Sequence, residues 1–426
     1  MTDFAKRAYD HSYRIDPIVR SLLDTDVYKL LMGQFIWMYY RLVPVTFKVI
    51  NRSKTIRLGN LISFDELKAQ LDHVRSLRFT PNELIWLAGN TFYGKKGIFM
   101  PEYIEFLRNL KLPDYHLEMV DGEIALSFSG DWASVTFWEI YSMIIVNTMR
   151  NRAKMKGMSR FDLRRLYNEA EHRLFTDLDV LAKNKIVGMS DFGTRRRHDF
   201  LWQKFCVEAC VEILGADFAG TSNSLLAMTL GIENRGTNGH EMPMVVATLA
   251  DTDEELQNSQ YSVLEQWQTL YDGNLLVMLP DTFGTTQFLK NAPDWVADWT
   301  GIRLDSKDPF VAGDEAIEFF RSRGRDPMDK LILPSDGLDV NRIVQLRDYF
   351  KGKVGRIGYG FGTNLTNNFP DPVKPISLVC KVSHANGKSA VKLSDNKNKR
   401  TGSPEQIERY VRVFGEEGID VSETKV

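Results

Sequence analysis

Between residues 186 and 361 the chain repeats one pattern, a short apolar run that ends in polar or glycine residues and is followed by a helical stretch. The apolar runs have the length of buried strands, and the stretches between them have the spacing of amphipathic helices. The pattern predicts six strands, at residues 186–189, 217–219, 275–279, 302–304, 331–333 and 356–359. The later strands lead into Asp281, Asp305, Asp336 and Gly360. These residues are 24, 31 and 24 positions apart, close to the ~30 residues of a βαβ unit, so the strands are expected to be parallel.

The chain on either side of this repeat follows other patterns. It predicts helices at residues 24–40 and 405–414, two long helices within 132–181, a strand at 45–50, and hairpins at 115–128 and 376–393. Asp24 is the expected cap of the first helix, because an aspartate accepts hydrogen bonds from free N–H groups at a helix start. Asp121-Gly122 and Asn386-Gly387 are the expected hairpin turns. In the second hairpin the strands are placed at residues 376–382 and 389–393. The terminal segments therefore indicate mixed α+β structure.

Together these patterns predict an α/β protein of two domains. Residues 1–140 and 375–426 are assigned to a mixed α+β domain, and residues 141–374 to a βα-barrel-like catalytic domain. A doubly wound open sheet would also collect polar residues at its strand ends. Six contributing strand ends favour a closed or nearly closed barrel, whose active site lies at the carboxyl ends of the strands.

Composition excludes several classes of protein. A formal net charge of -2 excludes a globally basic nucleic-acid binder, so an anionic ligand has to be bound by individually placed residues. No run approaches the ~20 apolar residues needed to span a membrane, and the N-terminal residues 1–16 lack the apolar region of a signal peptide. The three cysteines suggest no disulfide framework. These features predict a cytoplasmic protein.

His240 is the most informative candidate for chemistry. It lies in a segment whose two glycines, Gly236 and Gly239, allow the backbone to turn tightly and approach a ligand. An imidazole there can serve as base or nucleophile, and Asp281 is a candidate to hold and stabilise it. The alternative is an idle histidine on a surface loop.

Charged residues at other strand ends suggest an anionic ligand. The run 195–198, Arg-Arg-Arg-His, follows a strand and a tight turn at Gly193, where guanidinium groups can meet phosphate or carboxylate oxygens. Asp305 and Asp336 suit a ribose diol or Mg²⁺, and Arg303 shares the strand face of Asp305. Residues 360–364, Gly-Phe-Gly-Thr-Asn, can cradle a phosphate. The alternatives are a solvated charge run and a structural salt bridge.

Seven motifs in order closely resemble those of the bacterial nicotinate phosphoribosyltransferases. They are DTDVYK at 24–29, DFGTRR at 191–196, GTSN at 220–223, GTNGHE at 236–241, DTFGT at 281–285, RLDS at 303–306 and FGTN at 361–364. The similarity extends from about residue 20 to residue 400. It implies the fold of the type II phosphoribosyltransferases.

The resemblance also implies a reaction and its partners. Nicotinate and 5-phosphoribosyl 1-pyrophosphate would give nicotinate mononucleotide and pyrophosphate, with Mg²⁺ as cofactor and with ATP hydrolysis coupled through a phosphohistidine at His240. Nicotinate would meet Tyr28, contributed across a homodimer interface, and Phe192, Thr237 and Arg303. Arg195 would face phosphate; Asp305 and Asp336 would address the ribose and its metal; Gly362 and Thr363 would hold the 5′-phosphate.

Ser222 bears on which base is used. The related nicotinamide enzymes carry an acidic residue at the corresponding place, and an aspartate there would accept a hydrogen bond from a carboxamide and repel a carboxylate. Ser222 therefore favours nicotinate. A nicotinamide phosphoribosyltransferase and a noncatalytic sensor of phosphoribosyl ligands are the alternatives, and the chain lacks the histidine-rich ligand set of a metal-dependent hydrolase. Which of Lys397, Lys399 and Arg400 meets phosphate is left open.

Overall fold

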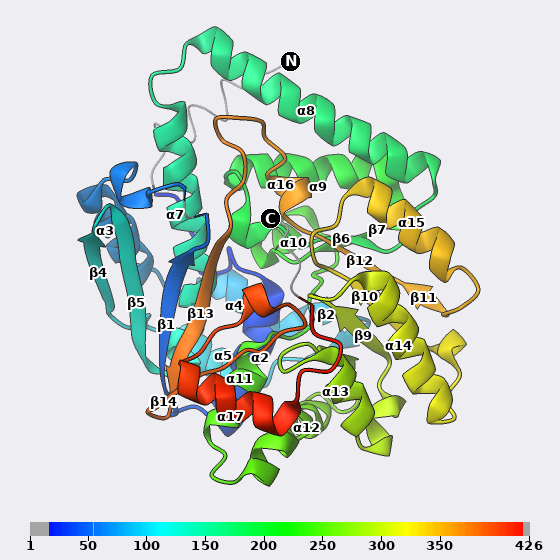
Figure 1. Ribbon diagram of the computed structural model, residues 1–426. Coiled ribbons are helices and arrows are strands. Elements are labelled where there is room, and N and C mark those ends of the chain that lie inside the picture. Colours follow the sequence, from blue (N-terminus) through cyan, green and yellow to red (C-terminus); the bar gives the residue numbers. More distant parts are fainter. Residues whose placement is uncertain (1–16, 54, 421–426) are drawn as a thin grey trace.

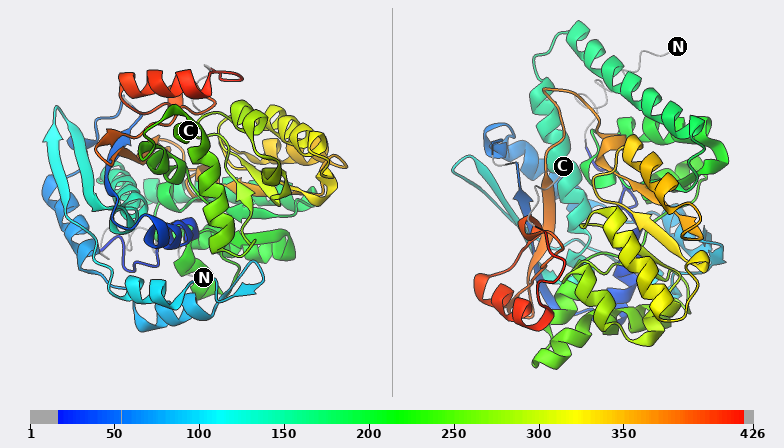
Figure 2. Two further views of the ribbon diagram at one scale, coloured as in Figure 1. Left: turned by 90° about the horizontal axis from the view of Figure 1, so that it is seen from below. Right: turned by 45° about the vertical axis from the view of Figure 1, so that its right-hand side comes forward.

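A computed structural model describes residues 17–53 and 55–420 (Figure 1). The strands form two main groups, an antiparallel sheet on one side of the molecule and a set of parallel strands on the other (Figure 2). Residues 1–16, on which the expectation about a signal peptide rested, lie outside the described residues. No helix in the described ranges is long and apolar enough to cross a bilayer.

The repeat between residues 186 and 361 forms the predicted parallel strands. They are β6 (Met189–Asp191), β7 (Phe218–Thr221), β8 (Val277–Met278), β9 (Gly301–Leu304), β10 (Leu331–Pro334), β11 (Arg356–Ile357) and β12 (Tyr359–Phe361). All adjacent pairs are parallel, in the orders β11-β10-β9-β8 and β12-β6-β7. Gly358 divides the sixth predicted strand into β11 and β12. Because β11 belongs to one group of strands and β12 to the other, this strand connects the two groups.

This set of strands curves into a nearly closed barrel. Beyond β7 a parallel bridge joins Thr221 to Asn234, and across the remaining gap the side chain of Asn238 donates to the Val277 carbonyl at 3.3 Å. The barrel-like α/β fold predicted from the repeat is confirmed. The domain boundaries at 140/141 and 374/375 stay a prediction.

Helices fill the intervals between the parallel strands. They are α9 (Phe200–Leu214), α10 (Ser224–Leu230), α11 (Glu241–Thr248), α12 (Asp253–Leu270), α13 (Thr285–Asn291), α14 (Pro309–Ser322) and α15 (Val340–Phe350), and α16 (Thr363–Thr366) follows the last parallel strand. Several begin at a polar residue that follows a strand. Asp308 caps α14 and Asp339 caps α15 through backbone N–H groups, as Asn223 does for α10. Strand ends thus supply both helix caps and the polar residues of the site.

The antiparallel sheet has the order β14-β13-β1-β5-β4. Its strands are β1 (Pro44–Asn51), β4 (Tyr115–Val120), β5 (Glu123–Asp131), β13 (Leu378–Ala385) and β14 (Lys388–Ser389). Figure 1 shows β1, in blue, beside β13, in orange, so the sheet joins segments from opposite ends of the chain. Both predicted hairpins form, with positive φ at Asp121-Gly122 and Asn386-Gly387. The second strand at 389–393 was wrong beyond Ser389, because the chain there leaves the sheet towards the barrel.

The other elements are largely helical. They are α2 (Val27–Tyr39), α3 (Phe64–Ser76), α4 (Pro81–Gly89), the short strands β2 (Thr91–Phe92) and β3 (Lys95–Lys96), α5 (Pro101–Arg108), α6 (Trp132–Val135), α7 (Trp138–Met155), α8 (Arg160–Lys183) and α17 (Pro404–Phe414). The two long helices predicted within 132–181 are α7 and α8, interrupted near Gly157. Helix α7 contacts both β13 and the turn at residues 194–196, so it connects the sheet with the barrel.

The first helix begins two residues later than a cap at Asp24 requires. Asp26 stands at the cap position of α2, without a side-chain cap bond. The carboxylate of Asp24 is bound instead by the Arg197 guanidinium, at 2.7 and 2.6 Å. The predicted cap was wrong because this buried ion pair takes both carboxylate oxygens.

Candidate active site

A single cavity at the carboxyl ends of the parallel strands collects the predicted site residues. Its lining includes His240, Arg195, Tyr28, Phe192, Ser222, Thr237, Arg303, Asp305, Asp336, Gly362 and Thr363. Asp281 does not line it but lies directly behind His240. Residues that are far apart in sequence meet here because parallel strands end at the same edge of the barrel.

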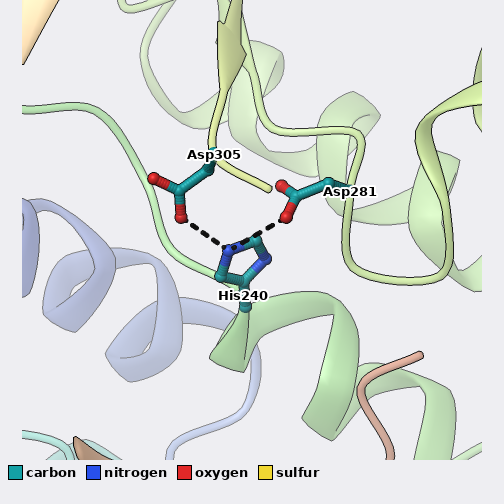
Figure 3. Close-up of side chains that lie close together, drawn as sticks. All are labelled: His240, Asp281 and Asp305. Atoms are coloured by element: carbon teal, nitrogen blue, oxygen red, sulfur yellow. Dashed lines mark hydrogen bonds and ion pairs between the residues drawn. The ribbon is translucent and has the colours of Figure 1, made fainter. Parts of the chain in front are cut away.

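The imidazole of His240 lies at the start of α11 and faces the carboxylates of Asp281 and Asp305, which follow β8 and β9 (Figure 3). Nδ1 lies 3.0 Å from the Thr282 hydroxyl, and Nε2 lies 3.1 Å from Asp305 Oδ2. Lys392 Nζ approaches Nε2 to 2.9 Å. Only 18% of the side chain is exposed. The ring is therefore oriented within the site, and the idle surface histidine is excluded.

Asp281 contacts the ring differently from what its sequence position suggested. Its Oδ2 lies 3.6 Å from His240 Nε2, too far for a hydrogen bond, and 3.1 Å from Lys392 Nζ. The nearer carboxylate is Asp305, which had been predicted for the ribose and its metal. The prediction that Asp281 holds the imidazole needs correction, since Thr282 and Asp305 make the hydrogen bonds and Asp281 acts through its charge.

Burial and the surrounding charges set the protonation of this cluster. Burial lowers the pKa of His240, Asp281 raises it and Lys392 lowers it again, and the net pKa is below the usual value. Burial raises the pKa of Asp305, but the positive charge of Arg303 and the hydrogen bond with His240 outweigh it and hold that pKa well below its usual range. The cluster thus favours a neutral imidazole beside an ionised carboxylate.

Two groups of residues have the donor atoms of a metal site. His240, Asp281 and Asp305 offer ligand atoms within 4.8 Å of one another, but the Lys392 ammonium lies among them and supplies the positive charge there. Asp305 and Asp336, the predicted pair, both line the cavity, and Asp336 Oδ2 accepts from Lys399 Nζ at 2.6 Å.

Arg303 lies on the same face of its strand as Asp305, as the sequence predicted. Its Nη2 pairs with Asp305 Oδ1 at 2.9 Å, so the two side chains share one face of β9. Nε donates to the Ser335 hydroxyl at 2.8 Å, and the guanidinium lies 6.0 Å from the centre of the Phe192 ring. Thr237 Oγ1 is 3.4 Å from Nη1. Arg303 is thus fixed beside an aromatic wall in the cavity.

The cationic run at residues 195–198 is divided by the fold. Arg195 and Arg196 line the cavity. Arg197 is fully buried against Asp24, and His198 stacks on Phe369 with ring centres 3.7 Å apart. Burial lowers the pKa of His198 to about 4, so the ring is neutral. The expectation of one cationic cluster was wrong for Arg197, because its side chain fills the protein interior, and His198, whose role the sequence left undecided, is buried there as well.

Tyr28, Phe192 and Ser222 line the same part of the cavity within one chain. Helix α2 brings Tyr28 to its own chain's cavity, and a contribution of Tyr28 across a homodimer interface stays a prediction. The Ser222 hydroxyl donates to Asp26 Oδ1 at 2.5 Å. Burial raises the pKa of Asp26 to about 6 despite the Ser222 hydrogen bond. An acidic residue is therefore present beside Ser222 after all, because Asp26, which precedes α2, lies within hydrogen-bond distance of its hydroxyl.

A buried ion-pair network holds the first residue of α11. Lys29, with no exposed side-chain surface, pairs with Glu139 at 2.5 Å and also with Glu241. Glu241 accepts from Trp132 Nε1 at 3.0 Å, and Arg195 Nη1 lies 3.4 Å from Glu139. This network ties α2, α7 and the cavity arginine to the residue that follows His240.

A further group of cavity residues is cationic. Its lining includes Arg52, Arg196, Lys381, Lys392 and Lys399. Burial lowers the pKa of Lys381, and the neighbouring charges of Lys392 and Arg52 lower it further. Of the three basic residues left open by the sequence, Lys399 lines the cavity, whereas Lys397 and Arg400 pair with Glu416 at 3.3 and 2.6 Å. Such a group of cations favours a polyanionic ligand.

Sequence reasoning missed several of these residues. Lys392 lies between Val391 and Leu393, where strand alternation suggests a solvated side chain, yet it is 4% exposed. Arg52 follows β1 and Lys381 lies on β13, and neither of these strands carried a motif. The one signal in the sequence was that Lys392 falls within the segment that resembles the family, which extends to about residue 400.

Comparisons with known proteins agree with this geometry. The Nicotinate phosphoribosyltransferase (NAPRTase) family matches residues 187–417, more than half of the chain, and the NAPRTase N-terminal domain matches residues 23–147. A nicotinate phosphoribosyltransferase from Porphyromonas gingivalis is 25% identical, with a TM-score of 0.83 over 93% of this chain and 100% of that one. One from Vibrio cholerae is 27% identical, with a TM-score of 0.83 over 95% of each chain.

Proposed function

The chain belongs to the nicotinate phosphoribosyltransferase family and acts in NAD biosynthesis, and from that premise we propose that it couples nicotinate transfer to ATP hydrolysis through a phosphohistidine at His240. Nicotinate and 5-phosphoribosyl 1-pyrophosphate are its substrates. The observation that carries the coupling is the oriented, neutral imidazole of His240 in the same cavity as Phe192 and Arg303. An imidazole with a free lone pair can accept a phosphoryl group beside the site of glycosyl transfer.

The base is proposed to lie between Phe192 and Arg303. The ring wall offers stacking, and the guanidinium offers charge-assisted hydrogen bonds to the pyridine carboxylate. Thr237 adds a hydroxyl at 3.4 Å from Arg303. Selection of nicotinate over nicotinamide then depends on the positive charge of Arg303 more than on Ser222, because Ser222 is bound to Asp26.

The phosphoribosyl group is proposed to extend from the base towards the cations. Gly362 and Thr363, at the start of α16, would hold its 5′-phosphate, and Arg195 would face a phosphate. Asp305 and Asp336 offer the carboxylate oxygens that Mg²⁺ prefers, so the residues fit the ion, which would neutralise charge on the departing pyrophosphate. Because the transition state resembles an oxocarbenium ion, positioning and charge stabilisation matter more than a strong base.

We further propose that the protein is cytoplasmic and forms a homodimer. A cytoplasmic location agrees with three buried, free cysteines. A homodimer is suggested by the resemblance alone, since Tyr28 lines the cavity of its own chain.

Replacing Arg303 by methionine is expected to lower kcat/KM for nicotinate by about 10- to 100-fold, the equivalent of losing a charged hydrogen bond worth about 1.5–3 kcal/mol. Activity with nicotinamide should change far less, because a carboxamide carries no charge. Steady-state assays with each base measure both values. Arg356→Met, at the exposed amino end of the same barrel, is the matched control.

Two results would contradict this assignment. A preference of the unmodified enzyme for nicotinamide by more than tenfold would overturn the choice of base. Binding of phosphoribosyl pyrophosphate without any product, in the presence of either base and ATP, would support the noncatalytic sensor.

A further inference from the structure

Lys392 is the cation closest to the proposed phosphate acceptor. Its Nζ lies 2.9 Å from His240 Nε2 and 3.1 Å from Asp281 Oδ2. The side chain is 4% exposed and lines the cavity. Among the described cationic side chains, it is the one whose charged group contacts the ring. Lys399 is held by Asp336 instead, at 2.6 Å.

The backbone around Lys392 is fixed to the loop that follows β8. The N–H groups of Leu393 and Ser394 both donate to the Thr282 carbonyl, at 2.9 and 3.1 Å. Asp395 accepts from the Thr285 N–H and hydroxyl, each at 2.6 Å. The segment that carries the ammonium is therefore bound to the loop that carries Asp281 and Thr282, so the ammonium is held against the imidazole before any ligand arrives.

Charges near the ring explain what this ammonium is needed for. Two carboxylates, from Asp281 and Asp305, lie 3.6 and 3.1 Å from Nε2. Asp305 is also paired with Arg303 at 2.9 Å, whereas the ammonium of Lys392 contacts the ring itself. A phosphoryl group on His240 would add about 1.5 to 2 negative charges. Without Lys392 no cation among the described residues would contact the ring, and repulsion from the Asp281 carboxylate would raise the barrier.

We propose that Lys392 is a catalytic residue of the phosphoryl transfer between ATP and His240, where its ammonium stabilises the negative charge of the moving group. The inference rests on the proposed ATP coupling. In this step the bond from the γ-phosphorus to the oxygen bridging it to the β-phosphorus breaks. ADP leaves with that oxygen and its electron pair, and a P–N bond forms from the lone pair of an imidazole nitrogen. Lys392 keeps its proton and donates hydrogen bonds to the phosphoryl oxygens.

The test is the rate of phosphoenzyme formation in Lys392→Met, measured in single turnovers with γ-labelled ATP and an alkaline quench. At saturating ATP the rate is expected to fall by about 100-fold or more, the scale seen when a preorganised charge donor is removed. A rise in KM for ATP with an unchanged maximal rate would overturn the proposal, as would an unchanged rate. Lys388→Met is the control, because Lys388 lies outside the cavity and donates to the Ala250 carbonyl.

A second variant separates charge from packing. Lys392→Cys, alkylated with 2-bromoethylamine, regains an ammonium at nearly the same length, and the rate is expected to recover at least tenfold. The native cysteines are buried, so treated wild-type enzyme is the control. No recovery would overturn the proposal in favour of a packing role. If the wild-type enzyme forms no phosphoenzyme, the proposed ATP coupling itself is wrong. If it does and Lys392→Met matches it, only the assignment of Lys392 is wrong.

Discussion

His240→Ala is expected to abolish ATP hydrolysis and its stimulation of nicotinate transfer, while a slow transfer without ATP survives. Removing a covalent nucleophile lowers its reaction by about three orders of magnitude or more, since no other group can accept the phosphoryl group. The glycosyl transfer keeps its own groups, because Arg195, Arg303 and Asp336 do not depend on the imidazole for their place in the cavity. Nicotinate mononucleotide and ADP formation, each with and without ATP, measure the two reactions.

The substitution should leave the surrounding structure in place. His240 makes no side-chain cap bond to α11, and alanine is compatible with the helix start. Lys392 keeps its ion pair with Asp281 at 3.1 Å. Loss of a neutral imidazole therefore removes the acceptor without leaving the ammonium unpaired. His172→Ala, on the exposed surface of α8, is the matched control. ATP coupling that persists in His240→Ala would exclude the phosphohistidine, and equal loss of both reactions would indicate a role in glycosyl transfer itself.

The parts of the site that sequence predicted are those set by strand ends. Asp305 and Arg303 share a face because side chains alternate along a strand, and the ion pair at 2.9 Å follows from that alternation. The repeat placed Asp281, Asp336 and Gly362 at the same edge of the barrel because parallel strands end together. Both features follow from the positions of the strands, which the spacing of hydrophobic residues predicts.

Contacts between distant segments were beyond the same reasoning. Lys392 reaches His240 because the chain leaves the antiparallel sheet after Ser389 and bonds to the loop at Thr282. Nothing in the spacing of residues 389–393 distinguishes that path from a continuing strand. The position of Tyr28 in the cavity of its own chain was equally beyond local pattern, since the position of α2 against the barrel depends on tertiary packing.

Arg197 is the clearest case in which burial decides between a binding and a structural role. Sequence grouped it with Arg195 and Arg196 as a phosphate ligand. In the structure its guanidinium makes two hydrogen bonds to Asp24, at 2.7 and 2.6 Å, and a third to Gln203 at 3.1 Å. The exposed fractions of the Arg197 and Asp24 side chains are 0% and 2%. Breaking such a pair leaves a carboxylate buried without its counter-charge.

Arg197→Met is therefore expected to reduce the free energy of unfolding by about 3–5 kcal/mol, measured as a lower midpoint in denaturant and thermal unfolding. Arg197→Met with Asp24→Leu should recover a large part of the loss, because no buried charge then lacks a partner; recovery stays incomplete since Asn223 loses its acceptor. The neighbouring Arg196→Met is the control with the opposite signature: near-normal stability but weaker binding of the phosphoribosyl substrate, since Arg196 lines the cavity. If Arg197→Met instead unfolds like the wild type and loses substrate affinity, the guanidinium is a ligand group, and the ion pair with Asp24 does not persist in the working enzyme.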